Sequence, residues 1–498
     1  MAITTGDNNL NSVASSQKQT LSTNYLDLAS TANEGWAQQY VPDLMEKEAE
    51  VFGNRTISGF LSQIGAEEPM SADQVVWSEQ SRLHISVKGT VATGGSTNGT
   101  FTVTSDIDGN VLADGFTVAD HGVRVNDTVL IASAGIVTKC KVVDADTAVI
   151  QVEPYDKADL TGHATTSGGS TLLVYGSEYG KGLSYFANSD GSTAQDSHAA
   201  NEPTFKSFNN KPIILKDYYE VSGSDASRIG WVEITSEGGA SGYLWYLKAE
   251  SDTRSRFTDY LEMSMLEAEK TVGDSVIANS HGGTDSGAGG HGTQGLFAAI
   301  EDRGNITSGV SGVNAATDLA EFDAILAEFD KQGAIEENMM FVNRGTSLAI
   351  DDMLASMNSY GAGGTSYGVF SNDEEMALNL GFSGFRRGSY DFYKSDFRYL
   401  NDKATRGGIN EVAGSAAIRG VIVPAGTSTV YDQNLGKNLT RPFLHVRYRA
   451  SQTDDRKMKT WVTGSVGAAT SALDAMQIHF LSERCLVTQG ANNFMLMK

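Results

Sequence analysis

The fold is decided by residues 242–272, GYLWYLKAESDTRSRFTDYLEMSMLEAEKTV, which predict one helix of about 31 residues. No Gly or Pro interrupts the segment after Gly242. At about 1.5 Å per residue this helix would be about 46 Å long, whereas helices of globular proteins usually have about 10 to 14 residues. From Phe257 onward the apolar residues are three or four positions apart and form one stripe that we expect to face a core: Phe257, Leu261, Met265, Ala268 and Val272.

A long β-rich excursion precedes this helix. Leu83, Ile85 and Val87 alternate with polar residues, as in a strand with one exposed face. Residues 91–178 then contain about five or six short β-branched runs separated by turn residues, which predict an inserted small β-barrel or sandwich. Residues 56–90 and 179–237 are expected to form the extended loop and flanking strands that carry this module.

The remaining segments surround these parts. Residues 1–55 begin with a polar stretch rich in Ser, Thr, Asn and Gln, which is typical of a flexible arm. After the long helix, predicted helices alternate with predicted strands, and Gly333 can end the helix that contains Phe322 and Phe329. Three segments complete the expected α+β fold: 238–300, which contains the helix at 242–272, then 301–440 and 441–498.

Composition restricts the class of protein. The formal net charge of −24 disfavours a protein held to nucleic acid by phosphate attraction. Residues 381–460 carry 14 Lys and Arg against 7 Asp and Glu, a net charge of +7, which leaves −31 for the remainder. This asymmetry suits surfaces that meet copies of the same chain in a fixed orientation, and unevenly charged solvated surfaces are the alternative.

The chain shows no sign of export or of a disulfide framework. No stretch approaches about 18 consecutive apolar residues, and the polar N-terminus predicts no secretory signal. Cys140 and Cys485 lie far apart, each in an apolar strand-like run. We expect both to be buried free thiols, with no bridge or metal role.

Two patterns suggest catalytic or metal chemistry. Residues 364–368, GTSYG, match the nucleophile-elbow string, but an elbow needs a strand before it and a helix after it, whereas a Gly-rich loop precedes this one. His281, Asp285 and His291 could bind a metal, but their Gly-rich loop does not hold ligands at a short fixed spacing. We therefore interpret residues 364–368 as a glycine loop. We interpret the segment with His281, Asp285 and His291 as a surface loop.

A third pattern resembles a fragment of a calcium-binding loop. It consists of Asp106, Asp108 and Gly109. Thr104 stands where the first Asp is needed, and Gly115 stands where the motif requires Glu. A hairpin turn is the favoured interpretation.

Adjacent carboxylates and basic runs are further candidates for functional residues. Glu336 with Glu337 and Asp351 with Asp352 are expected on solvated surfaces, because nothing in the sequence focuses them on a pocket. The basic stretches 447–449 and 456–459 flank aromatic residues, so nucleic-acid contact is possible there, although alternating charge on an exposed strand is commoner. No phosphate-binding loop, dinucleotide fingerprint or His-Glu-x-x-His motif occurs.

The order of the parts resembles the major capsid proteins of tailed bacteriophages with the Hong Kong 97-type fold. Two stretches resemble the crAss-like phage branch: residues 295–304, GLFAAIEDRG, and residues 482–487, SERCLV, with Asn492-Asn493-Phe494 after them. The resemblance covers nearly the whole chain, and its motifs are structural. It implies an N-terminal arm at 1–55, an extended loop at 56–90 and 179–237 with the module 91–178 inserted, a peripheral domain at 238–300 with the spine helix 242–272, an axial domain at 301–440, and a return to the peripheral domain at 441–498.

The resemblance also implies a function. The chain would be a structural virion protein that self-assembles into hexamers and pentamers and forms the icosahedral capsid around the double-stranded DNA genome, with assembly in the bacterial host cytoplasm. Portal and auxiliary or decoration proteins would be partners, DNA would face the inner surface without specific binding, and no membrane would be involved. We expect no enzymatic activity and no catalytic, cofactor-binding or metal residues.

Two alternatives stay open. One is another virion component, such as a tail-tube or decoration protein, which would need less mixed helix and strand sequence after the β-rich region. The other is a carbohydrate-active enzyme with a β accessory module, although the sequence offers no focused carboxylate pair for glycoside hydrolysis.

Overall fold

The computed structural model divides the chain into two compact units, which we describe separately. Unit 1 comprises Met1–Val76 and Asn209–Lys498, and unit 2 comprises Trp77–Phe208. The structure describes the following residues, to which all structural statements refer: 59–61, 66–80, 82–93, 99–111, 121–133, 135–145, 147–163, 169–182, 205–226, 233–235, 241–271, 292–333, 335–358, 384–425, 427–432, 437–465 and 470–498.

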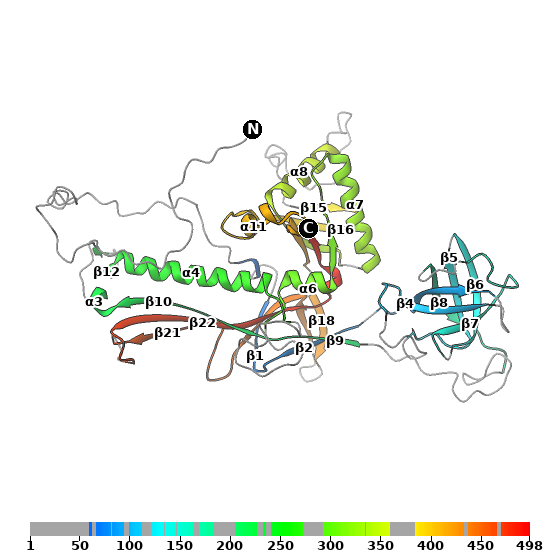
Figure 1. The fold of residues 1–498 in the computed structure, drawn as a ribbon, viewed down its shortest axis with the longest axis horizontal. Helices are drawn as coiled ribbons and strands as arrows, with labels where there is room; N and C mark the ends of the chain where they lie inside the picture. The colour runs from blue at the N-terminus through cyan, green and yellow to red at the C-terminus, as the bar shows by residue number, and fades with distance from the viewer. Residues whose placement is uncertain are drawn as a thin grey trace, which may run out of the picture. The chain divides into compact units, whose positions relative to one another are not determined.

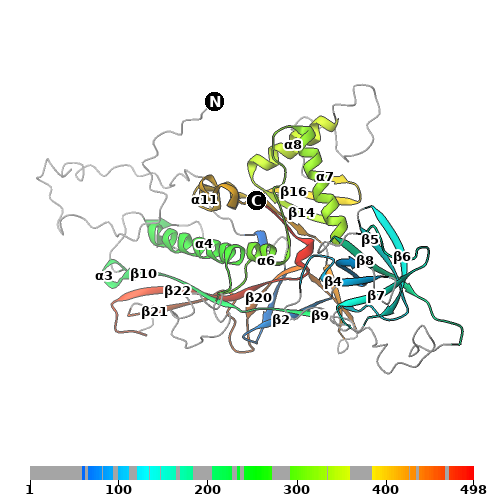
Figure 2. The ribbon, with the colours of Figure 1, turned by 45° about the vertical axis from the view of Figure 1, so that its right-hand side comes forward.

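Unit 2 contains a closed β-barrel, drawn in blue to cyan in Figures 1 and 2. Its strands close in the order β3-β4-β7-β6-β5-β8, and all neighbours are antiparallel. Alternate residues point inward, and Phe101, Ile131 and Leu172 are fully buried. The strand bounds are β3 Ser86–Ala92, β4 Thr100–Asp106, β5 Asp127–Ser133, β6 Ile136–Asp144, β7 Val149–Pro154 and β8 Ser170–Ser177.

The barrel begins earlier than the sequence analysis places it. Strand β3 was assigned largely to the extended loop, within residues 56–90, but its Ser86–Gly89 pair with β8 while its other edge pairs with β4. Without this strand the sheet could not close, because β8 and β4 would both have free edges. Outside the barrel, β2 (Val75–Gln80) pairs with β9 (Phe205–Asn210).

The first sheet of unit 1 carries the long helix. Its strand order is β1-β20-β22-β10, and β21 also pairs with β22. Helix α4 (Leu244–Glu267) runs alongside β10 and β22 in Figures 1 and 2, and Phe257 packs against Phe480 with ring centroids 6.0 Å apart. Strand β1 is parallel to β20, and the other pairings are antiparallel. The bounds are β1 Ala66–Met70, β10 Ile213–Ser222, β20 Leu444–Arg449, β21 Lys459–Gly464 and β22 Ala475–Thr488.

The apolar stripe of α4 faces this sheet and the adjoining core, as predicted. Phe257, Leu261 and Met265 are 1%, 3% and 0% exposed. Phe257 and Leu261 pack against Ile478 and Phe480 of β22, and Met265 joins a larger core with the C-terminal residues. Burial of the stripe therefore fixes which side of the helix meets the sheet.

The helix is shorter than the predicted 242–272. Ser241–Tyr243 form β12 and pair with β11 (Glu233–Thr235), which suits the low helix propensity of Gly242. At the other end, the Ala268 carbonyl accepts a hydrogen bond from Gly295 N–H at 2.7 Å. A Cβ on Gly295 would lie 2.8 Å from Ala268 N, so only glycine allows this close approach. Val272 lies outside the described residues.

The second sheet of unit 1 has six strands in the order β13-β23-β17-β14-β16-β15. Strand β17 is central and all five of its residues, GVIVP, are buried, which explains its continuous apolar run. Helices α7 (Ala315–Gln332) and α8 (Arg344–Asn358) contribute Phe322, Phe329 and Ile350 to its core. The strand bounds are β13 Asn305–Thr307, β14 Glu337–Val342, β15 Gly384–Arg387, β16 Tyr390–Asp396, β17 Gly420–Pro424 and β23 Met495–Met497.

The C-terminus departs from the predicted segmentation. Residues 441–498 were expected to return to the domain of the long helix. Strands β20, β21 and β22 do lie in the sheet that carries this helix, but β23 lies between β13 and β17 of the second sheet. Its three residues, Met495–Met497, are buried and complete that core. A strand this short shows too little periodicity to reveal its sheet.

Short elements complete the fold. Asn314 caps α7 by accepting a hydrogen bond from Thr317 N–H at 2.9 Å, and Gly333 ends the helix with φ +64°, as predicted. The mixture of helices and strands confirms the α+β class. The remaining bounds are α3 Gly223–Ala226, α6 Leu296–Arg303, α10 Arg398–Asn401, α11 Arg406–Ala413, η2 Gly414–Ala416, η3 Ala491–Asn493, β18 Thr427–Asp432 and β19 Lys437–Pro442.

Candidate functional site

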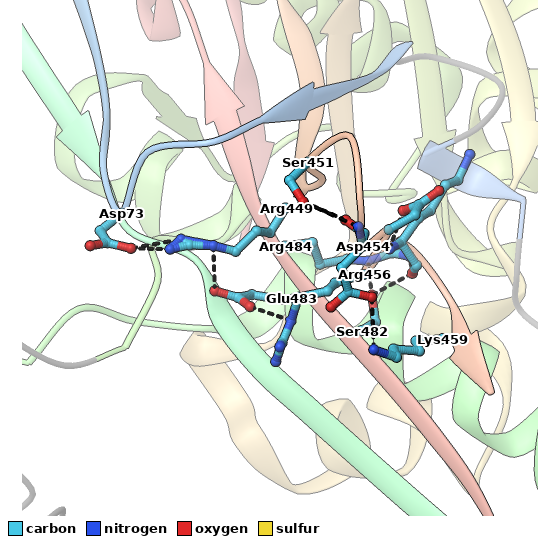
Figure 3. Close-up of polar contacts among 11 residues, drawn as sticks. Asp73, Arg449, Ser451, Asp454, Arg456, Lys459, Ser482, Glu483 and Arg484 are labelled. Atoms are coloured by element: carbon cyan, nitrogen blue, oxygen red, sulfur yellow. Dashed lines mark hydrogen bonds and ion pairs between the residues drawn. The ribbon is translucent and has the colours of Figure 1, made fainter. Parts of the chain in front are cut away.

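A dense cluster of ion pairs joins distant parts of the chain on the first sheet (Figure 3). At its centre, Glu483 of β22 forms ion pairs with Arg449, whose Nε lies 3.4 Å away, and with Arg456, whose Nε lies 2.7 Å away. Arg449 also forms an ion pair with Asp73. Ser482 Oγ and Arg484 Nη2 bind the Lys457 carbonyl at 2.7 and 2.9 Å. We call this the strand-crossing cluster; its further pairs are Glu67–Lys457, Glu67–Arg484, Glu68–Arg447 and Asp454–Lys459.

Strand pairing positions these charges. Because β1 runs parallel to β20, Glu68 lies opposite Arg447, and their side chains meet at 2.7 Å. Half-buried pairs of this kind contribute more to register than to stability, since desolvation offsets most of the Coulomb attraction. The cluster thus holds β1, which comes early in the chain, against strands from its last 60 or so residues.

The basic stretches 447–449 and 456–459 form ion pairs within the chain. Arg447, Arg449, Arg456, Lys457 and Lys459 each pair with a carboxylate. The side chain of Arg447 is only 16% exposed, whereas those of Lys457 and Lys459 are 44% and 41% exposed. A cation that is paired within the chain must give up its carboxylate partner to bind phosphate, which weakens the attraction to DNA.

One residue of the adjacent carboxylate pairs contradicts its prediction. Asp351 was expected on a solvated surface, but its side chain is 12% exposed and pairs with Lys394 of β16 at 2.5 Å. Lys394 also donates to the Ser347 carbonyl at 3.1 Å. Helix α8 packs against β16, so the helix face that bears Asp351 points inward. Asp352, Glu336 and Glu337 are exposed, as predicted.

The calcium-like fragment forms a turn at the end of β4, but not the favoured hairpin, because β4 pairs with β3 and β7 and not with β5, the next strand along the chain. Both Asp106 carboxylate oxygens bind Asn110, through its backbone N–H at 2.7 Å and its side-chain amide at 2.9 Å. Asp108 pairs with Arg82 at 3.0 Å, and Gly109 has φ +96°. The two carboxylates thus serve different partners and do not converge on one ion.

The other candidate motifs cannot be located. Ser366 with its glycine string, and His281, Asp285 and His291, lie outside the described residues. Among the residues that the structure describes, no three His, Cys, Asp or Glu side chains form a metal-binding group. No helix in the described part of the chain is long and apolar enough to cross a membrane.

The two thiols are buried and free, as predicted. Burial raises the pKa of Cys140, on β6, to about 12, and it does the same for Cys485, on β22. A thiol with so high a pKa carries almost no thiolate at neutral pH and is a poor nucleophile. Both residues act as core packing.

Sequence reasoning missed two polar arrangements. In the barrel, the buried His163 ring lies between Ser133 Oγ at 2.8 Å and Thr138 Oγ1 at 2.9 Å. On the first sheet, His479 stacks between Tyr218 and Trp461, with ring centroids 5.9 and 5.1 Å away. Each set comes from separate segments of the chain, and His163 itself lies between β7 and β8, so only the folded structure brings the residues together.

Comparisons with known proteins give weak likenesses. No protein-family model and no curated protein matches the chain. Among solved structures, a chain from Microbacterium phage Oxtober96 has 10% sequence identity and TM-score 0.36, covering 94% of this chain and 99% of that one. A chain from Mycobacterium phage Bobi has 7% identity and TM-score 0.35, with 94% and 98% coverage.

A third structure is described as the capsid of an empty GTA particle. Its chain has 11% identity and TM-score 0.34, and the match covers 95% of this chain and 98% of that one. Identities and TM-scores this low assign the chain to no family, so the argument for its function rests on its own architecture.

Proposed function

We propose that this protein is a major capsid protein of a tailed bacteriophage. Its copies would assemble into hexamers and pentamers and enclose the double-stranded DNA genome in an icosahedral shell. The fold would be of the Hong Kong 97 type, with α4 as its spine helix, and the sequence would resemble the crAss-like branch. Its action is assembly without turnover.

One observation carries the proposal. A single 24-residue helix, α4, lies along the long antiparallel pair β10–β22, directly after a β excursion that carries an inserted barrel. This supports the order of parts expected from the sequence after the N-terminal arm: an extended loop, a spine helix, then mixed helices and strands. A helix that packs along two long strands makes a stiff frame, which suits a shell subunit better than a catalytic scaffold built around a pocket.

The charge distribution agrees with this function. The chain is acidic overall, and in the described residues the basic stretches 447–449 and 456–459 are paired internally. A shell that must be filled with DNA benefits from an inner surface without strong phosphate attraction. Packaged DNA would therefore meet the shell without specific contacts, and portal and auxiliary capsid proteins would be its protein partners in the host cytoplasm.

Electron microscopy of the overexpressed full chain tests the proposal. We expect closed shells or rings of five and six subunits. The Phe257→Asp variant, which should not fold, serves as the control for aggregates that merely look like particles. Tubes would instead indicate a tail-tube protein, and persistent monomers would indicate a decoration protein. Glycan turnover that one carboxylate substitution abolishes would replace the proposal by the carbohydrate-active enzyme.

A further inference from the structure

The segment Gly59–Leu61 meets the long helix at one carboxylate. Glu262 of α4 accepts the Gly59 N–H through Oε1 at 3.2 Å and the Leu61 N–H through Oε2 at 3.3 Å. Gly59 has φ +113°, a conformation that L side chains rarely adopt. Backbone N–H groups two residues apart that converge on one anion form an anion-binding concavity, here filled by a carboxylate 201 residues away.

The side chain between these two N–H groups enters an aromatic slot. Phe60 is 5% exposed, stacks on Phe397 and meets Phe341 edge-on, with both ring centroids 4.6 Å away. Leu61 is 4% exposed in the same core. The segment is therefore held by two independent contacts, a ring in a slot and a backbone pair on a carboxylate.

A carboxylate is a costly choice at this position of the helix. Burial raises the pKa of Glu262, although the two N–H groups and the nearby Arg484 oppose that effect and Glu67 adds to it. An apolar residue would fill the space without desolvating a charge. Unlike an apolar residue, Glu262 accepts hydrogen bonds from the backbone of Gly59–Leu61.

The next residues along the chain are held separately. Strand β1 pairs with β20 from Ala66 to Met70, and Glu68 pairs with Arg447 at 2.7 Å. The contact of the segment with α4 and the pairing of β1 thus use different backbone groups and different side chains. We expect loss of the contacts of Gly59–Leu61 to stop at β1 and to leave the sheet intact.

We propose that Glu262 and the Phe60 slot form a latch, which holds Gly59–Leu61 on the body of the same subunit and can open while that body stays folded. A closed latch fixes the position of Gly59–Leu61 against α4, and an open latch releases these three residues. This device goes beyond the proposed function, because it operates within a single chain and can be tested without any assembly.

Hydrogen–deuterium exchange of the full chain tests the latch. In Glu262→Gln one acceptor oxygen becomes an amide NH₂, which cannot accept from a backbone N–H. We expect exchange in the peptide covering residues 59–61 to rise about tenfold or more, the size of losing a hydrogen bond to a charged group. Exchange in β22 and in the middle of α4 should change less than about twofold. Asp252→Asn, at an exposed position of the same helix, is the matched control.

Two further variants keep the test decisive if Glu262→Gln does not fold. Gly59→Ala strains the positive φ, and Phe60→Ala empties the aromatic slot. Either should open the same peptide and spare β22. Unchanged exchange at residues 59–61 in all three variants would overturn the latch, and so would an equal rise throughout unit 1, which would make these residues ordinary parts of one cooperative core.

Discussion

Asp351 and Asp352 are neighbours in sequence with different environments. Asp351 is buried against Lys394, whereas Asp352 is exposed on the outer side of α8. In a helix, consecutive residues point about 100° apart, so one can face a sheet while the next faces solvent. The two carboxylates are chemically identical and differ only in how far the fold buries them.

This difference predicts different costs of substitution. Asp351→Ala leaves the ammonium of Lys394 buried and without its carboxylate, and we expect it to lower the free energy of unfolding by about 3 to 5 kcal/mol. Asp352→Ala should change it by less than about 0.5 kcal/mol. Urea denaturation followed by circular dichroism measures both. Equal effects of the two substitutions would show that the buried pair contributes no more than a surface group.

A second residue-scale prediction concerns the stripe of α4. Replacement of Phe257, Leu261 or Met265 by Asp places a charge in a closed core, and removal of a large core side chain alone costs about 3 to 5 kcal/mol. Because domains have about 5 to 15 kcal/mol of stability, we expect loss of folding and not merely of assembly. Tyr260→Asp, at a position 44% exposed, should fold. Soluble, folded assemblies from any stripe variant would refute the spine-helix assignment.

At the scale of elements, the barrel contains a buried polar contact next to its apolar core. Between β5 and β6, the His163 ring joins hydroxyl groups from both strands. Burial lowers the pKa of His163, and the nearby positive charge of Lys157 lowers it further. The folded barrel therefore favours the neutral ring, which can accept a hydrogen bond from one hydroxyl and donate one to the other.

The pH dependence of the barrel follows from this pKa. Because the pKa is lower in the folded than in the unfolded state, the stability contribution is fully present above about pH 6.5. It is lost as the pH falls from the unfolded pKa toward the folded one. We expect the thermal midpoint of barrel unfolding to drop between pH 7 and pH 5, with a smaller drop in His163→Gln. An NMR titration that placed the folded pKa above 6.5 would contradict this prediction.

At the scale of the whole molecule, the chain is acidic but its charges are unevenly distributed. The segment 381–460 is net positive, and much of its charge in the described residues is used within the chain. Each ion pair uses one cation and one carboxylate, so the net charge of −24 falls on acidic side chains outside such pairs. Such an excess of acidic side chains repels phosphate and does not bind it.

This charge balance predicts no binding to duplex DNA. At physiological salt the purified protein should not retard duplex DNA at concentrations up to about 10 µM, within the range where basic proteins bind non-specifically. An electrophoretic mobility shift assay with a basic protein as positive control measures this. Retardation that weakens with added salt would contradict the proposed inert inner surface and would reopen nucleic-acid contact by Lys and Arg.

Sequence patterns anticipated those features that depend on neighbours along the chain. The spacing of Phe257, Leu261 and Met265 predicted their common buried face, and the apolar runs around Cys140 and Cys485 predicted buried thiols. Gly333 was correctly expected to end α7. Boundaries were less accurate: α4 starts at Leu244, because Gly242 takes part in a strand pair that no local pattern encodes.

By itself, therefore, the sequence determined the α+β class, the apolar faces and the acidic net charge, since periodicity and charge are properties of local composition. Only the tertiary structure decided that β1 lies beside β20, that β23 completes the second sheet, and that Glu262 receives Gly59–Leu61. The physical reason is that these contacts are made largely by backbone N–H and C=O groups. Such groups are nearly identical in every residue, so they leave no signature in the sequence until the chain has folded.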